Sequence, residues 1–268
     1  MDIIFALPAK LAPPLLVWAG VCAVGLLVER VGPAERGQPL AHLRLNLGYG
    51  ALATAIVALL NPALGAIGIA VVNACGGGLI QLADGGWALV ASAAVFVFAI
   101  DFMEYVFHRA QHAVPFLWAM HSLHHSDPSV NVTTTTRAFW LEAGIKAVFV
   151  YPVVGILFHA TPEVLSIYGA CQLYHFVNHL NLKVHFGRWW VVLNGPQFHR
   201  IHHSIETRHF DRNFAAFFPI FDWLFGTYHR PQPGEFPATG LGTRAVPRSL
   251  LQATIWPLRD IRTSGRTT

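Results

Sequence analysis

Uncharged apolar runs alternate with short polar segments along most of this chain. A helix needs about 18 or more such residues to cross about 30 Å of hydrocarbon. One run fits a buried helix of a soluble protein, but several runs of this length predict an all-α, polytopic transmembrane helical bundle. The runs are Leu11–Val28, Leu45–Val72, Val164–Leu182 and one that begins at Trp87 and meets its first charge at Asp101.

One more, shorter segment, Glu142–Phe158, is fourth in chain order and contains Lys146, whose long side chain can snorkel from near the end of a span. We therefore expect about four to five spans. The run Leu45–Val72 is longer than one straight crossing needs, and Asn61 and Pro62 interrupt it. A kinked helix and a shallow hairpin both fit this pattern. The composition agrees with a membrane protein, since only 12% of the residues are charged, against about 25% in soluble domains.

The basic residues indicate how the bundle is oriented. Arg30, Arg36 and Arg44 lie between the first two runs, whereas residues 73–86 and 159–163 contain no Lys or Arg. By the positive-inside rule, residues 29–44, the histidine clusters described below and the C-terminus are cytoplasmic, and the N-terminus lies on the opposite side. This topology and nearby anionic lipid explain the net charge of +4, so no nucleic-acid partner is expected. The basic residues after the last run are Lys183, Arg188, Arg200, Arg208, Arg212, Arg230, Arg244, Arg248, Arg259, Arg262 and Arg266.

The pattern divides the chain into three parts. Residues 1–90 form an N-terminal transmembrane region, residues 91–230 form the part that carries chemistry, and residues 231–268 form a basic, loosely ordered tail rich in Pro, Gly, Thr and Arg. Cys22, Cys75 and Cys171 lie in or beside apolar runs without a CxxC spacing. We expect them to be packing residues, not disulfides or ligands.

Ten of the 15 histidines form four clusters in the second half of the chain. Two clusters read HxxxH and two read HxxHH, and imidazoles one helical turn apart face the same side. Neutral imidazole is a favoured ligand for iron, copper and zinc, and one metal ion needs only three or four protein ligands. The pattern predicts a cytoplasmic helical cap with a histidine-rich di-metal centre. Its ligands would be His108, His112, His121, His124, His125, His175, His179, His199, His202 and His203.

Ionisable side chains accompany the first cluster on one helical stripe. Asp101 and Glu104 are costly groups in or near a span, so they need a reason to be there. We expect each to accept a hydrogen bond from the ring N–H of a metal-bound histidine, which fixes the tautomer. The alternative is an ion pair with Arg109 or Arg137. The full stripe is Asp101, Glu104, Tyr105, His108 and His112.

Further polar candidates lie near the other clusters. Polar residues at the end of the last apolar run should face the interior of the bundle, and the segments around the second and fourth clusters should form short interfacial helices. His42, His159 and His229 are poor ligand candidates because they lie away from the clusters. The remaining candidates for supporting or substitute ligands are Gln172, Asn178, His185, His209 and Asp211.

These motifs resemble the fatty acid hydroxylase/sterol desaturase superfamily over about residues 95–230. The resemblance rests on the clusters that begin at His108, His121 and His199, and on the segment from Asp211 to Tyr228 that follows them. It implies an integral membrane enzyme with two iron ions, or zinc as a substitute, that activates O₂ to hydroxylate or desaturate lipids. One departure is Phe139-Trp140, where many relatives have His-Pro.

The ligand type also limits the chemistry. The chain has no flavin or nicotinamide fingerprint, so we expect electrons from a separate reductase or donor protein such as cytochrome b5 or a ferredoxin. An acyl, sterol or isoprenoid lipid would enter from the bilayer. Hydroxylation is the favoured reaction, and desaturation by the same centre is the alternative. A metal transporter or a non-enzymatic metal-binding membrane protein is a more remote alternative, since a transporter would line the midplane with ligands.

Overall fold

The computed structural model of the chain describes residues 2–242 and 246–258, and it is mostly helical. The first half contains α1 (Asp2–Glu29), α2 (Leu40–Ala74), β1 (Ile80–Gln81), α3 (Gly86–Ala113), α4 (Pro115–His125) and the 3-10 turn η1 (Val132–Thr136). Next come α5 (Leu141–Phe149), α6 (Tyr151–Leu157), β2 (Phe158–His159), α7 (Pro162–Cys171) and α8 (Tyr174–Asn178). The chain continues with η2 (Gly187–Val191), α9 (Pro196–His202), η3 (Thr207–His209), α10 (Ile220–Leu224) and α11 (Leu250–Thr254).

Three helices are long and apolar enough to cross a membrane: Leu7–Glu29 within α1, then α2 and α3. Many of their apolar side chains do not pack inside the protein: Leu16 is 71% exposed and Val24 is 62% exposed. Apolar surface of this extent marks contact with a membrane. The prediction of a mainly helical membrane protein is therefore confirmed, with three single helices of sufficient length among the described residues.

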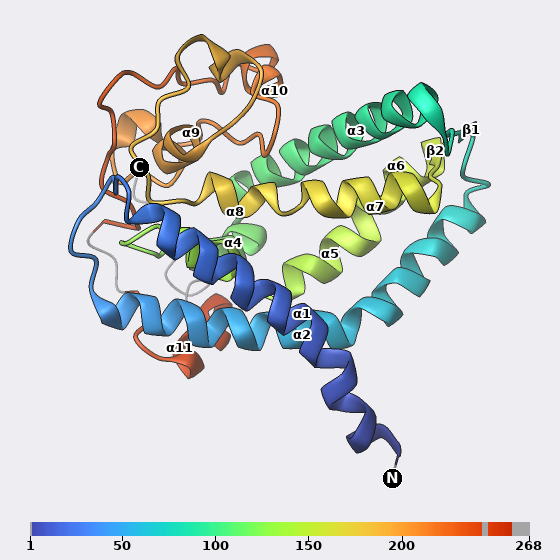
Figure 1. The fold of residues 1–268 in the computed structure, drawn as a ribbon, viewed down its shortest axis with the longest axis horizontal. Helices are drawn as coiled ribbons and strands as arrows, with labels where there is room; N and C mark the ends of the chain where they lie inside the picture. Colours follow the sequence, from blue (N-terminus) through green and yellow to red (C-terminus); the bar gives the residue numbers. More distant parts are fainter. Residues whose placement is uncertain (1, 243–245, 259–268) are drawn as a thin grey trace.

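The second apolar run forms one bent helix and not a hairpin. α2 continues through Pro62 for 35 residues, about 50 Å at 1.5 Å per residue. Figure 1 shows its two halves running in different directions. Proline has no N–H and its ring crowds the preceding turn, so a bend inside an otherwise continuous helix is expected.

The fourth and fifth predicted spans are each broken into two short helices. α5 ends at Phe149 and α6 begins at Tyr151, followed directly by Pro152, which cannot donate a helical hydrogen bond. α7 and α8 are separated at Gln172 and Leu173, where bonds three residues apart replace the α-helical ones. Among the described residues, neither segment is therefore one of the three helices that are long enough to cross a membrane.

The turn between α6 and α7 lies at the same end of the molecule as the connection between α2 and α3. There, β1 and β2 pair in parallel, with Ile80 opposite Phe158. We call this end, which includes β1 and β2, the far end (Figure 1). α5–α6 therefore leads towards the far end and α7–α8 leads back from it, in the order that the sequence predicts for a fourth and a fifth segment.

The helices α4, η1, η2, α9, η3, α10 and α11 form a region that we call the cap. It includes part of the expected tail: Trp256 is 8% exposed and its indole N–H donates to Ser122 Oγ over 2.8 Å. Tyr49 of α2, Leu123 of α4 and Ala253 of α11 pack in the same cluster. The described tail is thus packed against the bundle, in contrast to the loose order expected from its composition. Arg244, Arg259, Arg262 and Arg266 lie outside the described residues.

Candidate metal centre

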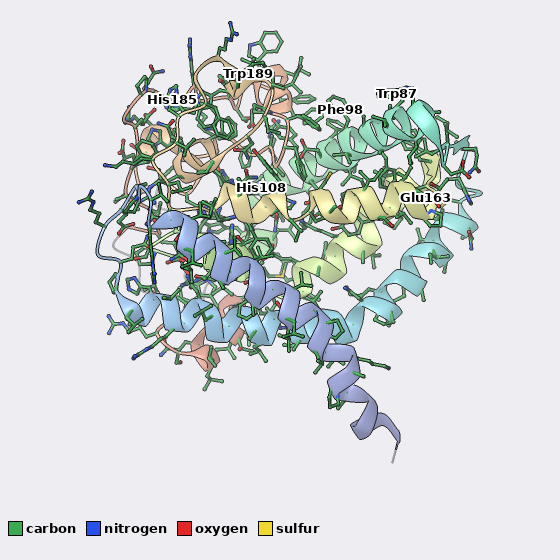
Figure 2. All side chains as sticks on the ribbon, viewed as in Figure 1. Trp87, Phe98, His108, Glu163, His185 and Trp189 are labelled. Atoms are coloured by element: carbon green, nitrogen blue, oxygen red, sulfur yellow. The ribbon has the colours of Figure 1, made fainter. Side chains whose placement is uncertain are left out.

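The histidine clusters meet where α3, α4, α8 and α9 converge. His108 and His112 lie one turn apart near the end of α3. The second cluster ends α4 and the last cluster lies on α9 and the residue after it, so both are on short helices as predicted. Figure 2 shows His108 in the middle of the molecule, well away from Trp87 and Glu163 at the far end.

Nine of the ten predicted ligands form two adjacent groups, and within each group one ring nitrogen per residue lies within 4.8 Å of every other. We call them the first and second histidine groups. The rings of His125 and His203 join the two groups, stacked with their centroids 4.4 Å apart. The first group is His108, His112, His121, His125 and His202, and the second is His124, His179, His199 and His203. His175 lies outside both groups and lines the adjoining cavity.

The spacing of the ring nitrogens fits a metal ion. Nε2 of His179 lies 3.1 Å from Nε2 of His124 and 3.0 Å from Nε2 of His199. In the first group, the Nε2 atoms of His108 and His121 are 3.1 Å apart. Neighbouring nitrogen ligands at about 2.0–2.1 Å from one ion lie roughly 2.8–3.4 Å from each other in octahedral or tetrahedral geometry. The facing nitrogens therefore have the separation of ligands that share an ion.

Backbone carbonyls hold three of these rings in the orientation that ligation requires. Nδ1 of His108 lies 2.7 Å from the Phe214 carbonyl, and Nδ1 of His202 lies 2.8 Å from that of Arg212. His179 bonds the carbonyl of His175 in the same way. A carbonyl only accepts, so Nδ1 carries the proton and Nε2 keeps its lone pair for a metal ion.

In the first histidine group, two carboxylates also bond Nδ1 atoms and so orient the rings. Asp211 lies 3.1 Å from Nδ1 of His112, and Glu142 lies 3.3 Å from Nδ1 of His121. Asp211 was a candidate from its position in the sequence. Glu142 was missed, although an ionisable residue in or near a span is the same signal that singled out Asp101.

His124, His202 and His203 are neutral at pH 7. Burial, reinforced by neighbouring imidazoles, holds the pKa of His124 and that of His203 well below the usual range of histidine. For His202, burial is again the main cause and lowers the pKa to about 3. Neutral imidazole is the form that binds a metal ion, so no proton has to be displaced first.

The acidic residues of α3 have other partners than predicted. Asp101 accepts hydrogen bonds from the backbone N–H groups of Phe217 and Phe218, at 3.0 and 2.8 Å. Glu104 pairs with Lys146, not with Arg109 or Arg137. Asp101 precedes His108 by about two turns, roughly 10 Å along the axis, so it meets the chain that follows the last cluster and not a ligand ring. Tyr105 likewise bonds Thr227 Oγ1 at 2.9 Å.

Lys146 also differs from its predicted role. Its ammonium group is turned inward to Glu104, whose other oxygen accepts from the Tyr151 hydroxyl at 3.3 Å. The side chain therefore does not snorkel from the end of a span.

The remaining candidates are divided between the cavity, the surface and a separate group of three residues. Gln172 and Asn178 line the cavity beside the histidine groups. His185 accepts from the Gly187 N–H at 2.9 Å and lies with Trp189 at the periphery (Figure 2). His209 belongs to a separate trio with His229 and Glu235.

That trio is a hydrogen-bond network. Both imidazoles place Nε2 3.1 Å from the same oxygen of Glu235. The guanidinium of Arg208 lies 3.3 Å from that oxygen and supplies the positive charge that a metal ion would bring. We interpret the network as an anchor that fixes the chain after His229 to the segment after the last cluster.

A cavity of about 230 Å³ adjoins the two histidine groups. Its lining includes five candidate ligands, His108, His121, His124, His179 and His199, and also Glu104, Lys146, Gln172, His175 and Asn178. A small molecule in this cavity is therefore held directly beside the candidate ligands.

Asp211 provides a test of ring orientation. We expect Asp211→Asn to weaken metal binding about tenfold, because the acceptor of His112 loses its charge while its shape is kept. Asparagine tolerates the left-handed backbone at this position, where φ is 56°. Chelator competition on the purified protein measures the effect. Glu206→Gln, an exposed carboxylate paired with Arg208, is the control, and equal affinities for the two variants would contradict the role of Asp211.

Comparisons with known proteins agree on one family. A family model described as fatty acid hydroxylase matches residues 93–227, which is half of the chain. Alkylglycerol monooxygenase of Xenopus tropicalis is 34% identical over 130 residues, covering 48% of this chain and 28% of the relative. Ornithine lipid hydroxylase OlsE of Rhizobium tropici is 26% identical over 145 residues, covering 54% and 44%. The chain thus matches less than half the length of these relatives. No solved structure is matched.

Proposed function

Because the chain belongs to the fatty acid hydroxylase family, we propose that it is a membrane-bound, di-iron hydroxylase that uses O₂ to oxidise a lipid. The observation that carries this proposal is the pair of adjacent imidazole groups beside one cavity. Hydroxylation is favoured over desaturation because the similar proteins are named as a monooxygenase and a hydroxylase.

The reaction places one oxygen atom of O₂ in a C–H bond and reduces the other to water, so it consumes two electrons and two protons. Iron bound by the two histidine groups would supply the oxidising chemistry. The protein holds the ligand rings in one tautomer through Phe214, Arg212, Asp211 and Glu142. The adjoining cavity would hold the reacting carbon, and a lipid that fills it would limit the access of water. The electrons come from a separate donor protein, a cytochrome b5, a ferredoxin or a similar carrier.

Metal content and lipid composition test the proposal together. The protein purified without chelators should carry about two metal ions per chain, iron in the active form and zinc as a substitute. Membranes from cells that express it should contain lipids heavier by one oxygen atom, detected by mass spectrometry. Full activity with one metal ion or none would remove the di-iron assignment, whereas a loss of two hydrogens in place of the gain would mean desaturation.

We also propose that the histidine groups and the C-terminus are cytoplasmic and that the N-terminus lies on the opposite side. The support is the asymmetry of Lys and Arg between the two ends of the bundle. A reporter fused after Thr268 should be active only in the cytoplasm, and one inserted near Gly77, at the far end, only outside. A reporter after Thr268 that is active outside would overturn the topology and the delivery of electrons from the cytoplasm.

A further inference from the structure

One peptide group joins a candidate ligand to a buried carboxylate. The peptide between Phe214 and Ala215 accepts a hydrogen bond from Nδ1 of His108 through its carbonyl, over 2.7 Å. The N–H of the same peptide donates to Oδ2 of Asp222 over 2.8 Å. The carbonyl and the N–H of a planar trans peptide point in opposite directions. The peptide therefore lies between the imidazole ring and the carboxylate and is bonded to both.

The surroundings of Asp222 favour its charged form. The side chain is 0% exposed, and its second oxygen, Oδ1, accepts from the Phe214 N–H at 2.8 Å and from the Thr227 hydroxyl at 2.7 Å. Three donors on two oxygens suit a carboxylate, which only accepts. Burial raises the pKa of Asp222 to about 6, which still leaves the group mostly ionised at pH 7.

The other two carbonyls that orient a ring have neutral groups behind them. The N–H that follows the Arg212 carbonyl donates to the Thr227 carbonyl over 2.9 Å. The N–H that follows the His175 carbonyl donates to the Leu173 carbonyl over 3.1 Å. Of the three rings held by a backbone carbonyl, that of His108 is thus the one that a peptide links to an anion.

A charge at the N–H end of a peptide changes the carbonyl end. The two ends are conjugated through the partial double bond of the C–N link, and hydrogen bonds in a chain polarise one another. The carboxylate therefore makes the Phe214 carbonyl a stronger acceptor for Nδ1–H of His108. A stronger bond at Nδ1 raises the basicity of the ligating nitrogen, which is Nε2, the atom that faces His121 at 3.1 Å.

We propose that Asp222 is a positioning residue for the metal centre, which acts on His108 through the Phe214–Ala215 peptide and raises the metal affinity of the first histidine group. This inference rests on the di-metal centre of the proposed function. Asp222 touches no candidate ligand directly, in contrast to Asp211 and Glu142, the two carboxylates that bond rings of the same group. The first histidine group thus has a third carboxylate that supports it.

Zinc binding tests this role without any measurement of activity. Asp222→Asn keeps the size of the side chain and removes its charge. The purified, metal-free protein is titrated with Zn²⁺ in competition with a chelating dye, and we expect one of the two sites to be weakened about tenfold while the other is unchanged. Unchanged affinity at both sites would overturn the inference and leave the metal centre standing. A wild-type protein that binds no zinc would overturn the metal centre and the inference with it.

Asp101 provides the matched control. It is also 0% exposed, and it accepts from two consecutive backbone N–H groups of the same loop, those of Phe217 and Phe218. The carbonyls of these two peptides accept from asparagine N–H groups and not from an imidazole. Asp101→Asn should therefore lower the unfolding midpoint about as much as Asp222→Asn does, but leave both zinc affinities unchanged. An equal loss of zinc affinity in the two variants would mean that Asp222 only holds the loop in place, which would overturn the inference.

A measurement on the wild type is independent of how the variants fold. Isotope labels in the carbonyl of Phe and the amide nitrogen of Ala select three peptides for nuclear magnetic resonance: Phe5-Ala6, Phe98-Ala99 and Phe214-Ala215. Zinc at Nε2 of His108 makes Nδ1–H a stronger donor and polarises the last of these peptides further. The amide proton of Ala215 should then move downfield, and that of Ala99 should stay in place. An Ala215 signal that does not move when zinc binds would contradict the proposed link.

Discussion

Replacing His124 or His202 by alanine is expected to abolish hydroxylation, with a loss of at least about 100-fold, since removing a ligand costs more than the 10–100-fold of an outer partner. The two residues belong to different histidine groups. Each variant therefore leaves one group complete, and the metal content should fall from about two ions per chain to about one. Metal analysis of the purified variants, together with product formation in membranes, measures both effects.

Histidines outside the groups provide the controls. His159 is exposed at the far end on β2, and His42 bonds the Ser129 hydroxyl at 2.8 Å. Alanine at either position should leave the metal content and the product unchanged. Equal losses at His159 and His124 would mean that the substitutions report on folding and not on ligation. The sequence pattern predicts that His175 is a ligand, whereas the structure places it outside both histidine groups. A loss of metal in His175→Ala would show that it is a ligand.

The helical periodicity of the histidines explains why so much of the centre could be predicted. The spacing of His108 and His112, and that of the HxxHH clusters, already places the rings on common faces of short helices. The resemblance to a known family then predicts that these faces meet in one metal centre. The orienting carbonyls of Phe214 and Arg212 could not be predicted in this way, because every non-proline residue has the same backbone groups. Their positions depend on how the chain after α9 folds back onto α3.

The predictions about the fold were incomplete because hydrophobicity alone does not locate breaks in helices or the partners of charged residues. The run Val164–Leu182 contains no charge that would mark the break at Gln172 and Leu173. From the sequence alone, Lys146 was interpreted as a residue near the membrane surface. Its actual partner, Glu104, is 42 positions away in the sequence. An isolated charge in an apolar segment therefore identifies a position that needs a partner, but it does not identify the partner.

Arg137 is another charge of this kind, and its loss should destabilise the protein strongly. Arg137 is 1% exposed. Its guanidinium donates to Asn46 Oδ1 at 2.9 Å and Ser126 Oγ at 2.7 Å, and it lies 4.0 Å from Asp127. Arg137→Met would leave Asp127 as a buried charge without its cation, which typically costs 3–5 kcal/mol. At about 2–4 °C per kcal/mol for a chain of this size, the unfolding midpoint should fall by roughly 10 °C. Thermal unfolding in detergent at fixed metal concentration measures it.

The hydrogen bonds of Arg137 also explain why its replacement should affect the metal centre. Arg137 also donates to the carbonyl of Leu123 at 3.1 Å, in the turn of α4 that carries His124 and His125. The double variant Arg137→Met/Asp127→Asn should recover part of the stability, because it removes the uncompensated charge. If the double variant is as unstable as the single one, the guanidinium acts through its shape and hydrogen bonds alone. Lys183→Met, which removes an exposed cation, should leave the midpoint unchanged. A comparable fall there would show that loss of positive charge in general, and not the buried pair, causes the effect.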